Sequence, residues 1–567
     1  MNTVSFSGNG LELSDESGLF SVVSATAATA PHRIALCSGA DGEVLTCGLL
    51  AERTRALASA LLERGVCAGD RIAVLGRTSL EWALLDVAAL AIGAVVVPVY
   101  PTSSDLQIRH VLTDSGSVHF AAETEGDAGR LTAAGAPQAW TFADLARWSF
   151  GPVHAELDPR ISTVRADDAA MIVYTSGTTG LAKGCVLTHR NMYAAAANTV
   201  LQTGTLFGGD GQDQAVTAHA LPLAHVFGQT ILFACLVGGT RTHLLPGIPD
   251  LLPALPTVRP TFLALVPYAL EKIRKAARRT LTPDVERAAV EEGLAVLRGV
   301  SPAGATGGPV ADLMGGRLQQ VISGGASLDD TTAGFFAHFG VNILNCYGMT
   351  ETATAVTVNE PRTNRLGTVG RPIPGTTVAI ADDGEVLIRG ANVTPGYWGA
   401  AADKTPVDGD GWLHTGDLGE IDQDGFLRIT GRRKEILVTS GGKNVAPTPL
   451  EDRIRLHPLV SNCIVVGDGR PFVSALLTLD RDRYATWREQ NGWSDGVDDT
   501  GLRAELQTAV DDANTLVSRA ESIREFRVVD GDFTLEAGLL TSSLKLRRAP
   551  IENAYRAEID ALYGVRV

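Results

Sequence analysis

The sequence predicts an α/β fold, with a large N-terminal domain of layered α/β subdomains and a β-rich subdomain, followed by a small, mobile α+β domain. Three observations lead to this prediction. The chain of 567 residues exceeds the length that one hydrophobic core normally organises. Helix-like and strand-like segments alternate in its first part, and the pattern changes twice further along. We expect the N-terminal domain over residues 1–431 and the C-terminal domain over residues 432–567.

The first part of the chain alternates apolar helix patterns with short β-rich runs, which is typical of parallel sheets covered by helices. Helices are expected at 49–64, 80–91 and 104–114, and strands at 71–75, 94–99 and 118–122. The uncharged run from Val87 to Tyr100 is shorter than the roughly 20 residues of a membrane-spanning helix. We interpret it as a buried helix that leads into a buried strand. Residues 123–140 and 298–308 are rich in Gly, Ala and Pro and are expected to form surface loops.

The pattern changes near Gly384, where short apolar runs are separated by Asp-Gly and Gly-rich turns. This spacing predicts the β-rich subdomain. The last part of the chain mixes both element types. It predicts helices at 449–457, 480–491 and 502–520, and strands at 462–467 and 473–479.

Composition excludes several classes of protein. The net charge of −16 disfavours nonspecific binding to nucleic acid, which requires a concentrated positive surface. The seven cysteines lie far apart and form no C-x-x-C pair, which argues against a disulfide framework and against a zinc site. The N-terminus lacks the basic start and apolar core of a signal peptide. These features favour a reduced, cytoplasmic setting.

A loop of small hydroxyl and glycine residues follows an apolar strand expected at 169–173. Its sequence is Tyr174-Thr-Ser-Gly-Thr-Thr-Gly-Leu-Ala-Lys183-Gly184. Backbone N–H groups, three hydroxyl donors and a lysine suit this loop to holding phosphates. It is not a Walker A loop, because Ala182 stands where that pattern requires Gly and Gly184 where it requires Ser or Thr.

Further motifs follow this loop in a fixed order. They are Leu221-Pro-Leu-Ala-His225-Val-Phe227, Ser323-Gly-Gly-Ala326, Tyr347-Gly-Met-Thr-Glu351, Gly416-Asp417, Thr430-Gly-Arg432, Asn444-Val-Ala-Pro447 and Leu540-Thr-Ser-Ser-Leu-Lys545. On these motifs, nearly the whole chain resembles the adenylate-forming (AMP-binding) superfamily, and it is most similar to the bacterial long-chain fatty acyl-CoA synthetases. The resemblance implies ATP-dependent activation of an acid as an acyl-AMP, followed by thioester formation with coenzyme A.

The resemblance also implies a role for each motif. Residues 175–180 would wrap the β- and γ-phosphates, Thr175 and Glu351 would hold Mg²⁺, Tyr347 would stack on adenine, and Asp417 would bind the ribose hydroxyls. The residues so implied for ATP binding are Thr175, Ser176, Gly177, Thr178, Thr179, Gly180, Lys183, Gly324, Gly325, Ala326, Tyr347, Gly348, Thr350, Asp417, Arg432 and Lys545.

The implied catalytic residues are Lys545, His225, Glu351 and Thr178. Lys545 would bridge the attacking carboxylate and the α-phosphate. His225, Phe227 and Cys346 would line the acid pocket. For the thiol step the C-terminal domain would rotate about Lys434, which would bring Gly441 and Gly442 beside the thiol channel.

Several positions depart from the pattern of the long-chain enzymes and leave alternatives open. Ala182 and Ser542 change loop residues, residues 285–308 look unlike the relatives, and Cys346 replaces a glycine of the pocket wall. A thiol there would narrow the tunnel, so a smaller acid is an alternative: an aryl or alkenyl acid, or nitrite joined to an aryl amine.

The acceptor is coenzyme A in our first interpretation, with a carrier-protein thiol or an amine as alternatives. From another class, a catalytically silent nucleotide-binding regulator stays possible in principle, although the presence of Glu351, Asp417, Arg432 and Lys545 together argues against it. Peripheral membrane contact is expected only if the substrate is a long-chain lipid. The identity of the acid, the pathway and the oligomeric state are left open by the sequence.

Overall fold

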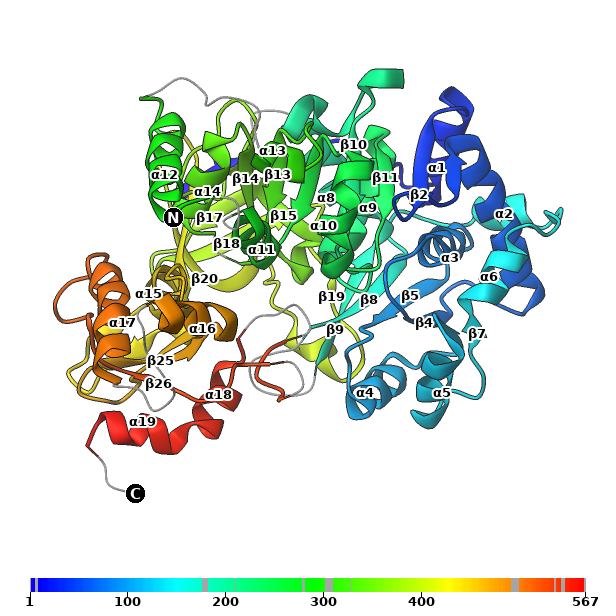
Figure 1. Cartoon of the computed structure of the whole chain (residues 1–567). Coiled ribbons are helices and arrows are strands. Elements are labelled where there is room, and N and C mark those ends of the chain that lie inside the picture. Colours follow the sequence, from blue (N-terminus) through cyan, green and yellow to red (C-terminus); the bar gives the residue numbers. More distant parts are fainter. Residues whose placement is uncertain are drawn as a thin grey trace. The chain divides into compact units, whose positions relative to one another are not determined.

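The structure is a computed structural model, which describes residues 2–5, 9–175, 182–209, 211–277, 281–300, 309–326, 328–490, 499–534, 537–541 and 546–564. The chain divides into two compact units (Figure 1). The larger unit comprises Met1–Thr415 and Ile421–Arg428. The smaller unit comprises Gly416–Glu420 and Ile429–Val567, so the chain enters it twice.

A seven-stranded sheet in the larger unit has the order β19-β9-β8-β5-β4-β6-β7. Its strands are β4 (Arg71–Leu75), β5 (Val95–Val99), β6 (His119–Ala122), β7 (Trp140–Thr141), β8 (Ala169–Thr175), β9 (Lys183–Thr188) and β19 (Gly396–Tyr397). The pairs from β8 to β7 are parallel, whereas β9 and β19 are antiparallel additions. The helices that alternate with these strands are α2 (Cys47–Glu63), α3 (Leu80–Ala91), α4 (Asp105–Ser115) and α5 (Glu125–Ala133). The predicted α/β class is confirmed.

One predicted loop is wrong. Helix α5 occupies much of residues 123–140 because Thr124 caps it, accepting a hydrogen bond from the backbone of Asp127. The helix buries Ala128 and Leu131. The Gly- and Ala-rich composition of this stretch is also typical of loops, and the helix was therefore not predicted. Of the second predicted loop, residues 301–308 lie outside the described part of the chain.

Two further sheets of the larger unit are built on parallel strands. The first has the order β10-β11-β2-β3, with β10 (Val216–His219), β11 (Arg241–Leu244), β2 (Ile34–Ser38) and β3 (Val44–Thr46). The second has the order β12-β13-β14-β15-β16, with β12 (Phe262–Leu265), β13 (Gln320–Ser323), β14 (Asn342–Met349), β15 (Thr354–Val358) and β16 (Arg371–Pro372). A backbone hydrogen bond of 2.8 Å from Thr261 to Val216 places the start of β12 beside β10.

Two hydrophobic cores cover opposite faces of these sheets. The first core contains helices α3, α8 (His189–Thr203) and α9 (Val226–Gly238), and its members from the sheets include Leu36, Leu244, Ala264, Ile322 and Cys346. The second core contains α10 (Ile248–Val258), α11 (Pro267–Ala277) and α14 (Asp330–His338), and its members from the sheets include Val216, Ala218, Leu263, Val321 and Ile343. Because successive strand residues point to opposite faces, membership of a core tells which way a side chain points.

The β-rich segment forms a sheet of order β1-β17-β18-β20-β21. Its strands are β1 (Asn2–Ser5), β17 (Thr376–Ile380), β18 (Glu385–Gly390), β20 (Leu413–Ile421) and β21 (Leu427–Arg432). The predicted change to short strands near Gly384 agrees with β18, which begins at the next residue. The loop between β20 and β21 carries the Asp-Gly turn that the sequence shows there.

The smaller unit is an α+β structure around a three-stranded sheet of order β24-β25-β26. Its main elements are β22 (Leu437–Val438), β23 (Asn444–Val445), α15 (Pro447–Arg455), β24 (Val460–Val466), β25 (Val473–Leu479), α16 (Arg481–Gln490), α17 (Asp499–Asn514), β26 (Ile523–Val528), α18 (Arg548–Ala554) and α19 (Arg556–Leu562). In the described part of the chain, no helix combines the length and the apolar character that crossing a membrane requires.

Candidate active site

The phosphate-binding loop predicted from the sequence joins two paired strands. Thr175 ends β8 and lies opposite Lys183, the first residue of β9. The antiparallel ladder therefore fixes both ends of the loop. Five of the predicted ATP-binding residues in this loop lie outside the described residues, namely Ser176, Gly177, Thr178, Thr179 and Gly180.

A tyrosine that the sequence analysis missed connects two of the predicted residues. The ammonium group of Lys183 lies 5.0 Å from the ring centroid of Tyr397, in β19. The Tyr397 hydroxyl donates a hydrogen bond of 2.7 Å to Oε1 of Glu351. Burial, and then the nearby Glu351 carboxylate, raise the pKa of the Tyr397 hydroxyl, which therefore stays protonated and acts as a donor. The structure thus brings Lys183 and Glu351 to one place. The only sequence signal for Tyr397 is the aromatic pair between Gly396 and Gly399.

The motif that carries Glu351 lies where β14 turns into β15. The ladder is irregular between Tyr347 and Gly348. A Cβ atom added to Gly348 would lie 1.6 Å from the carbonyl oxygen of Thr354, so only glycine fits there. Residues Thr350–Thr352 form a single 3₁₀ turn, and the two residues after this turn, Ala353 and Thr354, have φ of 49° and 104°.

A β-branched residue such as Thr354 is a true outlier at positive φ. Such strained backbone clusters at functional sites, where the surrounding structure holds it in place. Here the surroundings include two hydroxyls: Thr354 Oγ1 donates to Thr230 Oγ1 over 2.8 Å, and Thr230 Oγ1 donates to the Ala353 carbonyl over 2.8 Å. The tight turn therefore presents Glu351 from a fixed backbone.

The residues implied for Mg²⁺ have suitable chemistry. Mg²⁺ commonly binds through one or two carboxylates together with substrate phosphates. Glu351 supplies a half-buried carboxylate, of which one oxygen accepts the Tyr397 hydroxyl. Thr175 supplies a hydroxyl at the end of β8. Among the described residues there is no group of three or more His, Cys, Asp or Glu side chains arranged to hold a metal, so phosphate oxygens would have to complete this coordination.

Three predicted residues meet at the end of β13. A Cβ atom added to Gly324 would lie 2.5 Å from Sγ of Cys346 and 3.7 Å from the ring of Phe227. Gly324 and the following Gly325, which has φ of 88°, lead to the exposed Ala326. Burial raises the pKa of the Cys346 thiol to about 12, so this side chain is a neutral wall element and not a nucleophile.

His225 caps the N-terminus of α9. Its Nδ1 accepts a hydrogen bond of 3.1 Å from the backbone N–H of Phe227, and its ring lies edge-on to Tyr100 with a centroid distance of 6.4 Å. Burial raises the pKa of the Tyr100 hydroxyl. Tyr100 was not among the predicted site residues, and its position directly after β5 was the only signal for it.

Asp417 and Arg432 belong to the smaller unit and are paired. Nε of Arg432 lies 2.8 Å from Oδ1 of Asp417, whose side chain is 4% exposed. Lys434 is exposed in a short 3₁₀ turn, Arg433–Glu435, that follows β21. The predicted catalytic residue Lys545 lies outside the described residues.

Gly441 and Gly442 form the exposed tip of the β22–β23 hairpin. Gly442 has φ of 76°, and its N–H donates to the Thr439 carbonyl over 2.8 Å, which closes the turn. A pocket of about 590 Å³ lies beside this hairpin within the smaller unit. Its lining includes Gly441 and two cationic side chains, Lys443 and Arg524.

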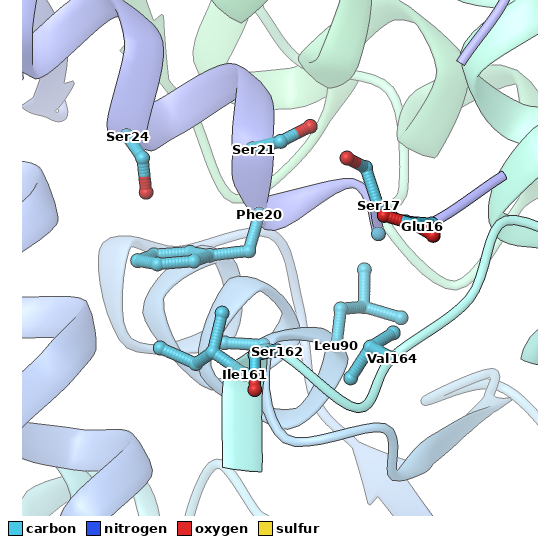
Figure 2. Close-up of a pocket in the computed structure, with 11 residues that line it drawn as sticks. Glu16, Ser17, Phe20, Ser21, Ser24, Leu90, Ile161, Ser162 and Val164 are labelled. Carbon is cyan, nitrogen blue, oxygen red and sulfur yellow. The ribbon is translucent and has the colours of Figure 1, made fainter. Parts of the chain in front are cut away.

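Another pocket, of about 210 Å³, lies in the larger unit between α1 (Phe20–Thr29) and the end of α3. Figure 2 shows the apolar side chains of Phe20, Leu90, Ile161 and Val164, with serine hydroxyls around them. No predicted site residue lines this pocket. It is therefore separate from the candidate active site.

Comparison with known families agrees with the motifs. Residues 23–398 match the AMP-binding enzyme family, and residues 434–566 match the AMP-binding enzyme C-terminal domain. The chain belongs to the AMP-binding enzyme family. The predicted resemblance and the predicted arrangement of a large α/β domain with a separate C-terminal domain are thereby confirmed.

The chain is 38% identical over 559 residues to the long-chain-fatty-acid–CoA ligase FadD15 of Mycobacterium tuberculosis, covering 92% of each protein. Two solved structures share its fold. One is o-succinylbenzoate CoA synthetase (MenE) of Bacillus subtilis in complex with its acyl-adenylate intermediate, with a TM-score of 0.71, 22% identity, and coverage of 94% of this chain and 97% of that one. The other is the anthranilate CoA ligase AuaEII in complex with anthranoyl-AMP, with a TM-score of 0.74, 18% identity, and coverage of 96% and 99%.

Proposed function

We propose that this chain activates a fatty acid, or a carboxylic acid of similar shape, as its acyl-AMP and transfers the acyl group to coenzyme A. The general class is established by the family and by its 38% identical relative: the protein is an ATP-dependent acid–CoA ligase that works through an acyl-AMP. The single observation that carries the proposal is the contact between Lys183, Tyr397 and Glu351. It gathers a cation, a hydroxyl donor and a carboxylate at the open end of the predicted phosphate loop.

In the first half-reaction the carboxylate oxygen of the acid attacks the α-phosphorus of ATP, and pyrophosphate leaves. The protein contributes alignment and charge, since this type of transfer depends mainly on positioning and electrostatics. Lys183 supplies positive charge to the phosphates. Glu351 and Thr175 would hold Mg²⁺, which would supply positive charge to the phosphates, and Lys545 would neutralise the α-phosphate region. Tyr397 orients the Glu351 carboxylate by donating to one of its oxygens.

In the second half-reaction the thiol sulfur attacks the acyl carbon, the bond to AMP breaks, and a thioester forms. We place the hinge for this step at Lys434, in the short turn that follows β21, and the boundary of the mobile domain at residues 431 and 432. Gly441 and Gly442 offer backbone without side chains at the tip of the hairpin. The neighbouring pocket holds the cations Lys443 and Arg524 beside the carboxylate of Glu525, and the two cations suit an anionic acceptor such as coenzyme A.

The acid pocket lies at Gly324, Phe227 and Cys346. A side-chain carbon at Gly324 would lie only 2.5 Å from Sγ of Cys346, so the thiol lies close against this strand end. This supports an acid shorter or slimmer than the long-chain substrates named for the relatives. A smaller acid, including an aryl acid, is the second candidate, favoured by the same contact.

Pyrophosphate release in the presence of ATP, Mg²⁺ and a panel of acids tests the proposal, with and without coenzyme A. We expect release with medium-length fatty acids and a thioester product only when coenzyme A is present. A Lys545→Ala variant should bind ATP and lose adenylation. Pyrophosphate release with nitrite or aryl acids but with none of the fatty acids would contradict the proposal. An amide product that forms without coenzyme A would also contradict it. The cytoplasmic setting and the lack of a nucleic-acid partner stay predictions.

A further inference from the structure

A buried histidine lies on the same sheet face as the acid pocket. His219 is the last residue of β10, and its side chain is 1% exposed. Neither Nδ1 nor Nε2 has a hydrogen-bond partner among the described residues. Burial lowers the pKa of this imidazole to about 4, so it is neutral at physiological pH, with one N–H donor and one acceptor. Buried polar atoms are nearly always hydrogen-bonded, so two unpaired atoms on one side chain require an explanation.

The direction of the His219 side chain follows from its neighbours. Val216, Ala218 and Ala220 belong to the second core, so the alternation of the strand turns His219 to the other face. Its partner in the parallel ladder, Leu244 of β11, belongs to the first core. Parallel partners point to the same face, and His219 therefore faces the first core.

The first core also contains the predicted pocket residues Phe227 and Cys346. The strand ends make this placement more specific. Strands β10, β11 and β2 run parallel, as do β12, β13 and β14, and His219 lies at the carboxyl end of β10. Ligands of open α/β sheets bind at the carboxyl ends of the strands. Only residues 220–224 separate His219 from His225, the predicted pocket residue at the start of α9.

A second unpaired atom lies on the helix that covers this face. Oε1 of Gln229 in α9 is buried and has no partner among the described residues, although its Nε2 donates to the Leu223 carbonyl over 2.9 Å. Gln229 lies two residues after Phe227, on a different side of the same helix. Strand β10 and the helix that covers it therefore each carry a buried polar atom that has no partner in the described part of the chain.

We propose that His219 is a specificity-determining residue that hydrogen-bonds a hydroxyl group on the chain of the acid substrate. This inference rests on the proposed function, because it needs an acid in the pocket at Phe227 and Cys346. A hydroxyl group can both donate and accept, so it pairs with either nitrogen of a neutral imidazole. A plain hydrocarbon chain leaves both nitrogens unpaired. A site with such a buried group discriminates against the substrate that cannot pair with it.

The test uses dodecanoic acid and a matched panel of hydroxydodecanoic acids with the hydroxyl at successive positions. The rate of pyrophosphate release is measured for each acid. For the unaltered protein we expect kcat/KM to be about 10- to 100-fold higher for one hydroxylated positional isomer than for dodecanoic acid. His219→Leu should abolish this preference and improve the use of dodecanoic acid. His219→Gln, which keeps a donor and an acceptor, should retain part of the preference.

His243→Leu is the matched control. His243 is a buried histidine on the neighbouring strand β11, but it lies beside Leu244 in the strand and faces away from the first core. Its Nδ1 lies 2.9 Å from the Gly39 carbonyl. This variant should keep the acid preference of the unaltered protein. ATP-induced thermal stabilisation checks that each variant is folded.

Equal use of dodecanoic acid and all its hydroxylated forms by the unaltered protein would overturn the inference and leave the proposed function standing. The same holds if His219→Leu changes no preference, because the imidazole would then be a purely structural group. Absence of pyrophosphate release with every acid would overturn the proposed function, and the inference with it.

Discussion

Asp86 should make the larger unit less stable as the pH rises. This residue lies in α3 and is 1% exposed, and neither carboxyl oxygen has a hydrogen-bond partner among the described residues. Burial raises the pKa of its carboxyl group from the ordinary value of 3.8 to about 8. The folded state therefore holds this proton more tightly than the unfolded state does. Its contribution to stability is complete below pH 4 and is lost as the pH rises towards 8.

The size of the effect follows from linkage. Each unit of difference in pKa corresponds to about 1.4 kcal/mol, so between pH 5 and pH 8 the free energy of unfolding should fall by about 4 kcal/mol because of Asp86 alone. Asp86→Asn keeps the shape of the side chain and does not titrate. The excess of the variant's free energy of unfolding over that of the unaltered protein should therefore grow by about 4 kcal/mol between pH 5 and pH 8.

Calorimetry of both proteins at pH 5, 6, 7 and 8 measures this difference. For a cooperative unit of more than 400 residues, the separation of the two melting temperatures should grow by about 4–5 °C between pH 5 and pH 8. Asp167→Asn is the control, because the pKa of this exposed carboxyl is lowered by a hydrogen bond from Arg190 and should give no gain at high pH. Parallel curves of melting temperature against pH for the unaltered protein and Asp86→Asn would refute the reasoning.

Three further changes test the sites. Tyr397→Phe removes the donor to Glu351, so adenylation measured by pyrophosphate release should fall about tenfold and require more Mg²⁺; an unchanged Mg²⁺ dependence would count against the metal site. Cys346→Gly should shift kcat/KM about tenfold towards longer acids in a chain-length series, because it removes the thiol beside Gly324; the same optimum in both proteins would reject Cys346 as a wall of the pocket. Glu451→Gln should lower the stability of the smaller unit by about 3–5 kcal/mol, since it breaks the buried ion pair with Arg548 (2.6 Å). Calorimetry of thermal unfolding would show this, and a loss of stability below about 1 kcal/mol would mean that Arg548 finds another partner.

Much of the fold could be predicted because local signals agree with the packing. Strand β4 and helix α3 have the predicted bounds, since the apolar run of β4 ends at Gly76 and Ser79 caps α3. Helix α5 was missed because its buried face is made of Ala and Leu among glycines. There the cap at Thr124 was the better signal, as its side chain fixes the first turn whatever the composition that follows.

Without the family resemblance, the candidate site could be predicted only where its residues are neighbours in sequence. Thr175 and Lys183 flank one loop, so a strand, a loop and a strand imply that they pair. Tyr397 reaches Lys183 and Glu351 from a distant short strand, β19, which adds to the edge of the sheet beside β9. Hydrophobic periodicity says nothing about such a two-residue strand. Its contact with Glu351 therefore emerges only from the tertiary structure.

Buried polar groups without partners are the features that a sequence hides most completely, and two of them among the described residues, Asp86 and His219, call for opposite explanations. Asp86 lies in a helix that is buried on all sides, so no ligand can reach its carboxyl group. Burial of this group therefore lowers the stability of the fold without a compensating hydrogen bond. His219 lies at the carboxyl end of a strand, where a ligand can supply the missing hydrogen bond. The distinction is physical. Replacing either residue by an apolar one should stabilise the fold, but only at His219 should the gain come with a change in the acid that the enzyme prefers.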